Sequence, residues 1–240
     1  MNLVVGLLCE DGVVVGAAAS DASEAGASDA REPHPANTFV VRNDLILGGS
    51  GRVGLGQRFA DVVGAIRSDS RFQEWPALGI IKTICAEVVD DFASTRCDRA
   101  PFGALLALVA CDGFQLCEFA AGDLQPELKT PERWFVSMGT GKPVADPFLA
   151  FLRRTFLTSS PPGLAEGTLV ATWVLDYTVG LRSGAGTASE QIAVLAEEGP
   201  SLPLTARQLT EIEIADCLAE VRAAEKHLAS FRRASRASRP

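Results

Sequence analysis

The chain has 240 residues, a formal net charge of −8, 47% hydrophobic residues and 22% charged residues. These values are typical of a soluble globular protein, and the length suits one large domain with a substantial core. The sequence contains no run of ~18 apolar residues, so it predicts no membrane span. Its acidic charge argues against general nucleic-acid binding. The N-terminus lacks the basic start and cleavage site of a signal peptide, so we expect a cytoplasmic protein.

Counts of histidine, cysteine and lysine exclude further classes of site. The two histidines, His34 and His227, lie in a proline-flanked loop and on a predicted terminal helix, where a Ser-His-Asp triad is not expected. The cysteines lack the paired spacing of a zinc site, and most lie in apolar runs, so we expect buried, reduced thiols and no metal or cofactor. They are Cys9, Cys85, Cys97, Cys111, Cys117 and Cys217. The chain has four lysines, and the first is Lys82.

The first half of the chain predicts two hairpins followed by two helices. Apolar runs that flank short turns predict strands at 3–9, 13–19, 38–42 and 45–47. Apolar residues at helical spacing predict helices at 53–68 and 78–95. Residues 20–37 are rich in Ser, Ala, Asp and Pro, and so long a connection is expected to be mobile or functional.

The second half repeats this alternation. Strands are predicted at 102–111, 114–120, 134–138 and 190–197. Helices are predicted at 143–158, 167–179 and 205–231. Hairpins that alternate with helix pairs predict an α+β fold of two antiparallel sheets between helices, and disfavour a doubly wound parallel sheet. We expect one domain over 1–200, a C-terminal amphipathic helix over 201–231 and a basic disordered tail over 232–240.

Several segments, in order, resemble bacterial relatives of the proteasome. Val4–Ala19 is similar to the opening hairpin of a proteasome β subunit, and Phe135–Gly141 to the strand that leads into a glycine turn. Ala104–Val109 and Gly122–Glu127 resemble the HslV peptidase, whereas Leu175–Gly186 and Glu190–Ile192 resemble the Anbu branch. The resemblance covers residues 2–197 and implies the four-layer α-β-β-α sandwich of proteasome-type N-terminal-nucleophile hydrolases.

The resemblance also implies where a catalytic apparatus would lie. In this family an N-terminal threonine attacks the peptide bond, its own α-amine is the base, and a lysine and an aspartate support it. The nucleophile position falls on Asn2, the aspartate position on Ala18 and the lysine position on Asn37 or Thr38. Because no lysine precedes Lys82, no shift of the alignment restores that group. We therefore expect no catalytic residues of the family type.

A residual groove is expected even without this chemistry. Thr140 matches a supporting serine of the family, and Asp176 is the nearest match to a second supporting aspartate. The glycine-rich run before residue 52 matches a turn that borders the family's substrate groove, although it lacks the Lys-Ser/Thr of a phosphate loop. The candidate groove residues are Gly49, Ser50, Gly51 and Thr140.

The resemblance implies a structural or regulatory subunit that has lost peptidase activity. We expect a homo-oligomer, as a ring or an open spiral, or a complex with an active paralogue, and no nucleic-acid or membrane partner. One alternative is a threonine-type peptidase or amidohydrolase with an atypical or processed nucleophile, such as Ser20, Ser23 or Thr38. Another is a module that binds a peptide or small ligand in the old groove.

Overall fold

A computed structural model describes residues 2–20, 37–69, 74–96, 102–157, 161–183, 188–197 and 204–237. Within these ranges the chain forms two five-stranded antiparallel sheets and five α-helices, which confirms the α+β class. Residues 21–36, the greater part of the predicted long loop, lie outside the described residues. In the described part of the chain, no helix combines the length and the apolar character that a membrane span requires.

One sheet is built from two hairpins and a further strand, and the other is built from five strands that follow one another along the chain. The first sheet has the order β10-β9-β2-β1-β8 and the second has the order β3-β4-β5-β6-β7. The strands of the first sheet are β1 (Asn2–Leu8), β2 (Gly12–Ser20), β8 (Phe135–Met138), β9 (Ala188–Glu197) and β10 (Leu204–Gln208). Those of the second are β3 (Asn37–Arg42), β4 (Leu45–Gly51), β5 (Phe102–Ala110), β6 (Gly113–Phe119) and β7 (Pro126–Leu128).

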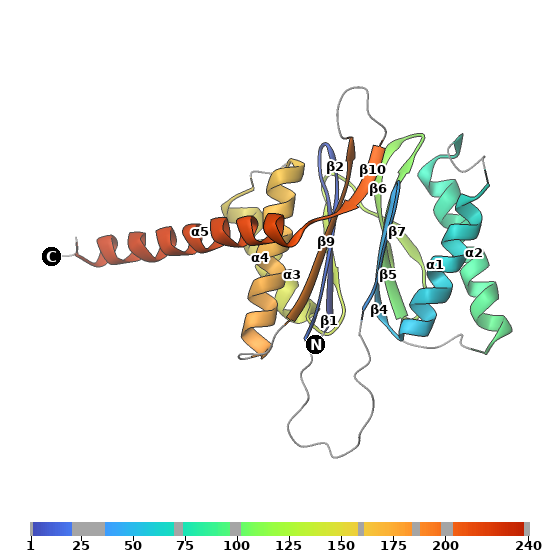
Figure 1. Cartoon of the computed structure of the whole chain (residues 1–240), viewed down its shortest axis with the longest axis horizontal. Helices are drawn as coiled ribbons and strands as arrows, with labels where there is room; N and C mark the ends of the chain where they lie inside the picture. Colours follow the sequence, from blue (N-terminus) through green and yellow to red (C-terminus); the bar gives the residue numbers. More distant parts are fainter. Residues whose placement is uncertain are drawn as a thin grey trace, which may run out of the picture.

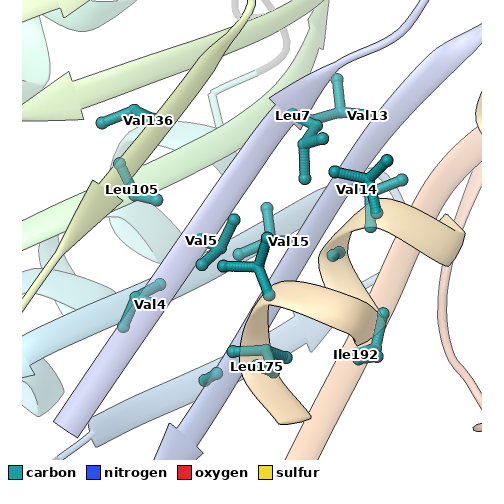
Figure 2. Close-up of a cluster of buried hydrophobic side chains, with 14 of the residues drawn as sticks. Val4, Val5, Leu7, Val13, Val14, Val15, Leu105, Val136, Leu175 and Ile192 are labelled. Carbon is teal, nitrogen blue, oxygen red and sulfur yellow. The ribbon is translucent and has the colours of Figure 1, made fainter. Parts of the chain in front are cut away.

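The two sheets face each other and a helix pair covers the outer face of each (Figure 1). The helices α1 (Val53–Arg67) and α2 (Ala77–Ser94) lie on the second sheet, and α3 (Lys142–Thr155) and α4 (Leu164–Ser183) lie on the first. Strands between two layers bury both faces, which explains why β1 and β2 are apolar throughout rather than alternating. Figure 2 shows this core, with Leu175 of α4 beside the strands that carry Val5, Val14 and Val15.

Close approach of the two sheets depends on glycine. A Cβ atom added to Gly48 of β4 would lie 2.5 Å from Val4 Cγ1 of β1. A Cβ atom on Gly6 would lie 3.0 to 3.1 Å from the side chains of Leu116 and Leu105. Glycine at these positions therefore allows the two sheets to approach this closely.

The C-terminal region differs from the sequence prediction. Residues 204–208 form β10 at the edge of the first sheet, so the last helix, α5 (Glu211–Ala237), begins at residue 211 and not at 205. The change occurs at a capping box: Glu213 Oε2 accepts from the Thr210 N–H at 2.8 Å, and Thr210 Oγ1 accepts from the Glu213 N–H at 3.3 Å. The helix continues through Ala237, into the segment 232–240 that was predicted to be a disordered tail.

Two of the five described cysteines are buried, as expected, and the other three are more open to solvent. Cys9 and Cys117 are buried, and burial raises the pKa of each thiol to about 12. Cys85 and Cys217 are half-buried. Cys111 is exposed, because it lies at the turn between β5 and β6 instead of inside either strand. All five are free thiols, whereas Cys97 lies outside the described residues.

Candidate functional site

A groove of about 590 Å³ opens at the end of the sandwich where β1 begins. Both sheets contribute to it: the start of β1, the end of β4, the start of β5, the end of β6, and the turn that joins β8 to α3. Its volume falls in the range of small-molecule and peptide sites. Its polar and backbone-lined part comprises Asn2, Ser50, Gly51, Glu118, Thr140 and Lys142.

Asn2 is fixed in this groove by the turn after β8. The Asn2 N–H donates to Thr140 Oγ1 at 3.0 Å, and the Thr140 N–H donates to Asn2 Oδ1 at 2.8 Å. The Gly141 N–H donates to the Asn2 carbonyl at 2.9 Å. Both the backbone and the side-chain amide of Asn2 are therefore engaged, and the side chain offers neither a hydroxyl nor a thiol for attack on a carbonyl.

The turn at 139–141 requires glycine at its first position. Gly139 has φ +94°, a left-handed conformation that L side chains rarely adopt. A Cβ atom there would also lie 2.7 Å from the Asn2 carbonyl oxygen. Glycine at this position therefore allows the turn to close on Asn2 and holds Thr140 against the groove floor.

Three of the four candidate groove residues line the groove and one does not. Ser50, Gly51 and Thr140 line the groove. Gly49 does not, because it precedes Ser50 by one residue and successive residues of a strand point to opposite faces. Gly51 departs from this alternation, because it is the last residue of β4 and has φ +128°. A Cβ atom at Gly49 would approach the ring of Phe102 and Thr38 Cβ, on the side of the sheet that α1 covers.

The other family positions do not converge on the groove. Ala18 is fully buried and pairs with Leu3, whose side chain lies near Gly141 and Thr178 under the α3–α4 layer. Thr38 faces the opposite way, with its Cβ only 2.6 Å from the place where Gly56 of α1 would carry its own Cβ atom. Ser50 pairs with Asn37, so the register places position 37, and not position 38, level with the groove.

Asp176 lies on α4 and accepts from the Arg222 guanidinium at 2.8 Å. It is not among the groove residues, and its role is to hold α5 against α4. Glu190 of β9 belongs to the same polar cluster. Burial, and then the nearby Asp176 carboxylate, raise the pKa of Glu190 to about 7, while Arg222 opposes the shift. This cluster is thus an interhelical contact and not a second supporting site.

Two charged residues of the groove were not predicted from the sequence. Lys142 opens α3 directly after the glycine turn, and its Nζ lies 3.8 Å from Asp146 Oδ2. Asp146 Oδ1 accepts from the Ser137 hydroxyl at 2.5 Å. Glu118 of β6 accepts from Lys129 Nζ at 2.6 Å. The position of Lys142, immediately after a turn that had been placed at the groove, was the available signal.

The groove therefore presents the Ser50 and Thr140 hydroxyls, the Lys142 ammonium and the Glu118 carboxylate. Among the described residues, no thiol lines it and no group of three His, Cys, Asp or Glu side chains is placed to hold a metal ion. Of the proposed processed nucleophiles, Thr38 faces α1 and Ser20 ends β2, while Ser23 lies outside the described residues. The arrangement suits binding of a polar chain better than nucleophilic attack.

No protein-family model matches the sequence, and no curated protein matches it at a significant level.

Proposed function

We propose that this chain is a proteasome-like subunit of the N-terminal-nucleophile type that lacks peptidase activity and acts through assembly, as a structural or regulatory subunit. The observation that supports it best is the groove at the start of β1, where the residue in the nucleophile position is an asparagine held by Thr140. The finer fold assignment, an α-β-β-α sandwich of the proteasome type, is part of this proposal. Its support is the order of helix pair, sheet, sheet and helix pair (Figure 1).

The missing chemistry supports inactivity. A threonine-type mechanism needs a hydroxyl or thiol nucleophile, a free amine as base, and a lysine with its orienting acid. The corresponding positions here carry Asn2, Asn37 or Thr38, and Ala18. Since these groups act as a unit, loss of all of them removes many orders of magnitude in rate and leaves substrate binding as the residual capacity.

The test combines intact mass, turnover and particle mass on one preparation. We expect an N-terminus without self-cleavage, no hydrolysis of a panel of fluorogenic peptides, and a particle heavier than the 25.3 kDa chain by light scattering. A monomeric particle that also captures no partner would contradict the assembly role. A mature chain that begins at Ser, Thr or Cys would contradict the proposed inactivity.

A second candidate function is hydrolysis by an atypical nucleophile. One observation favours it: the Thr140 and Ser50 hydroxyls share the groove with the Lys142 amine, and serine–lysine pairs act as nucleophile and base in other hydrolases. Turnover that is lost in Lys142→Met, and in either Thr140→Val or Ser50→Ala, would establish this candidate. Glu127→Gln, outside the groove on β7, is the matched control.

A further inference from the structure

The C-terminal helix α5 is anchored to the body for only part of its length. Val221 is fully buried against the core. Next to it, Arg222 bonds Asp176 of α4 at 2.8 Å, and Glu225 Oε1 accepts from Trp173 Nε1 of α4 at 3.2 Å. These contacts fix the direction in which the helix leaves the sandwich.

Between Lys226 and Ser230, α5 is no longer covered by the other described residues. Every residue from Lys226 to Ser230 is exposed, and Figure 1 shows α5 continuing away from the α3–α4 layer toward the C-terminus. Leu228 follows Val221 by seven residues, two helical turns on the same stripe, yet 44% of its surface is exposed. The apolar stripe that packs on α4 therefore continues as far as Leu228, which the other described residues leave exposed.

Where α5 leaves the body, α3, the residue that follows it and α4 carry a group of aromatic rings that we call the aromatic patch: Phe148, Phe151, Phe156, Trp173 and Tyr177. The rings contact one another, with centroids 4.2 Å apart for Phe148 and Tyr177 and 5.5 Å apart for Phe156 and Trp173. Phe151, Phe156 and Tyr177 remain 38–44% exposed. The patch is continuous with α5, because Trp173 both contacts Phe156 and bonds Glu225.

The charges of α5 are divided along its length. Over 211–225 five acidic residues and one arginine give a net charge of −4, and over 226–237 four basic residues give +4. The acidic residues are Glu211, Glu213, Asp216, Glu220 and Glu225, and the basic ones are Lys226, Arg232, Arg233 and Arg236. A helix of this kind repels a parallel copy of itself and is complementary to an antiparallel one.

We propose that a second copy of this chain binds here across a two-fold axis, with the two α5 helices antiparallel and the aromatic patch covered. This partner meets three conditions at once: it supplies a basic half-helix for the acidic half, an acidic half for the basic one, and an apolar surface for the patch and for Leu228. A contact in which the same surface serves both copies is the commonest form of homodimer. The inference rests on the proposed assembly role and specifies its interface.

A charge-swap experiment tests the antiparallel pairing directly. One variant carries Glu211→Lys, Asp216→Lys and Glu220→Lys, so that both halves of α5 are basic. The other carries Lys226→Glu, Arg232→Glu, Arg233→Glu and Arg236→Glu, so that both halves are acidic. Glu213, Arg222 and Glu225 stay unchanged, because they cap α5 or hold it on α4. We expect each variant alone to lose self-association at least tenfold and the 1:1 mixture to form a heterodimer.

A second variant pair addresses the aromatic patch. Phe151→Ser with Phe156→Ser should weaken association at least tenfold with little effect on the fold, because both rings are more than one-third exposed. Glu87→Lys with Asp90→Lys, on the exposed side of α2 and remote from α5, is the matched control and should leave association unchanged. Circular dichroism and light scattering report fold and particle mass for every variant.

The outcomes separate this inference from the proposed function. A wild-type oligomer that persists in both charge variants and in the patch variant would overturn the inference and leave the assembly role intact. A mixture of charge variants that stays monomeric while the wild type associates would also overturn the inference and leave the assembly role intact. A wild type that is itself monomeric and binds no partner contradicts both.

Discussion

Gly56 of α1 allows the helix to pack closely on the second sheet, because it has no side chain. A Cβ atom at Gly56 would lie 2.6 Å from Thr38 Cβ, and the β-branched Thr38 has few other rotamers to adopt. We expect Gly56→Ala to lower the free energy of unfolding by about 1–3 kcal/mol, the usual cost of overpacking. Chemical denaturation of the purified variant measures it.

The same helix provides the control. Gly54 has nothing within 4 Å of its added Cβ atom, so Gly54→Ala should be neutral or stabilise the protein by up to about 1 kcal/mol through helix propensity. Thr38→Ala in the Gly56→Ala background should recover most of the loss. Equal effects at the two glycines would mean that Thr38 does not set the helix–sheet distance.

The raised pKa of Glu190 predicts a pH dependence of stability. The folded state binds the Glu190 proton more tightly than the unfolded state, in which the pKa of Glu190 stays near 4.5. Protonation of Glu190 therefore stabilises the fold, and this contribution is fully present below pH 4.5. This contribution is lost as the pH rises toward the folded pKa of about 7. Compared with Glu190→Gln, the wild type should lose roughly 1 kcal/mol of unfolding free energy between pH 4.5 and 7, a value reduced by partial solvent contact.

Denaturation curves of both proteins at half-unit pH steps check this prediction. Their difference isolates Glu190 from the other carboxylates, which titrate in both. A constant difference across the window would show that the pKa of Glu190 is the same in the folded and unfolded states.

Of the groove residues, those that follow from local pattern were predictable. Ser50, Gly51 and Thr140 stand at glycine-rich turns that the sequence marks clearly. The sequence could not show that Ser50 faces the groove and Gly49 does not. Which of two neighbouring residues faces the groove depends on the pairing register of β3, β4 and β5. Glu118 enters the groove through the ladder between β5 and β6, a contact that no linear spacing encodes.

At the scale of elements, long periodic or apolar segments were predictable and short edge strands were not. β7 has three residues and β10 has five, and both lie at sheet edges, where pairing with a distant strand replaces any local hydrophobic pattern. β10 was read as the first turn of the last helix. The four-residue capping pattern of Thr210 and Glu213 was the sequence signal that places the true start of α5.

That cap supports the anchored half of α5 and gives an element-scale prediction. Thr210→Ala removes the hydroxyl that accepts from the Glu213 N–H, and should cost about 1 kcal/mol of stability. Thr210→Ser keeps the oxygen and should retain most of that stability. Urea denaturation of the two variants measures the difference, and equal losses would assign the effect to the methyl group instead of the cap.

For the whole molecule, assembly should appear as a concentration-dependent stability. A dimer that dissociates on unfolding is stabilised by mass action, so the Tm of the wild type should rise by roughly 1–3 °C for each tenfold increase in protein concentration. A chain that ends at Glu225 keeps the contacts of Val221, Arg222 and Glu225 with the body and should fold, but with a Tm independent of concentration. Calorimetry over two decades of concentration distinguishes the two. Raising the salt should shrink the wild-type slope, because screening weakens the proposed pairing of opposite charges along α5.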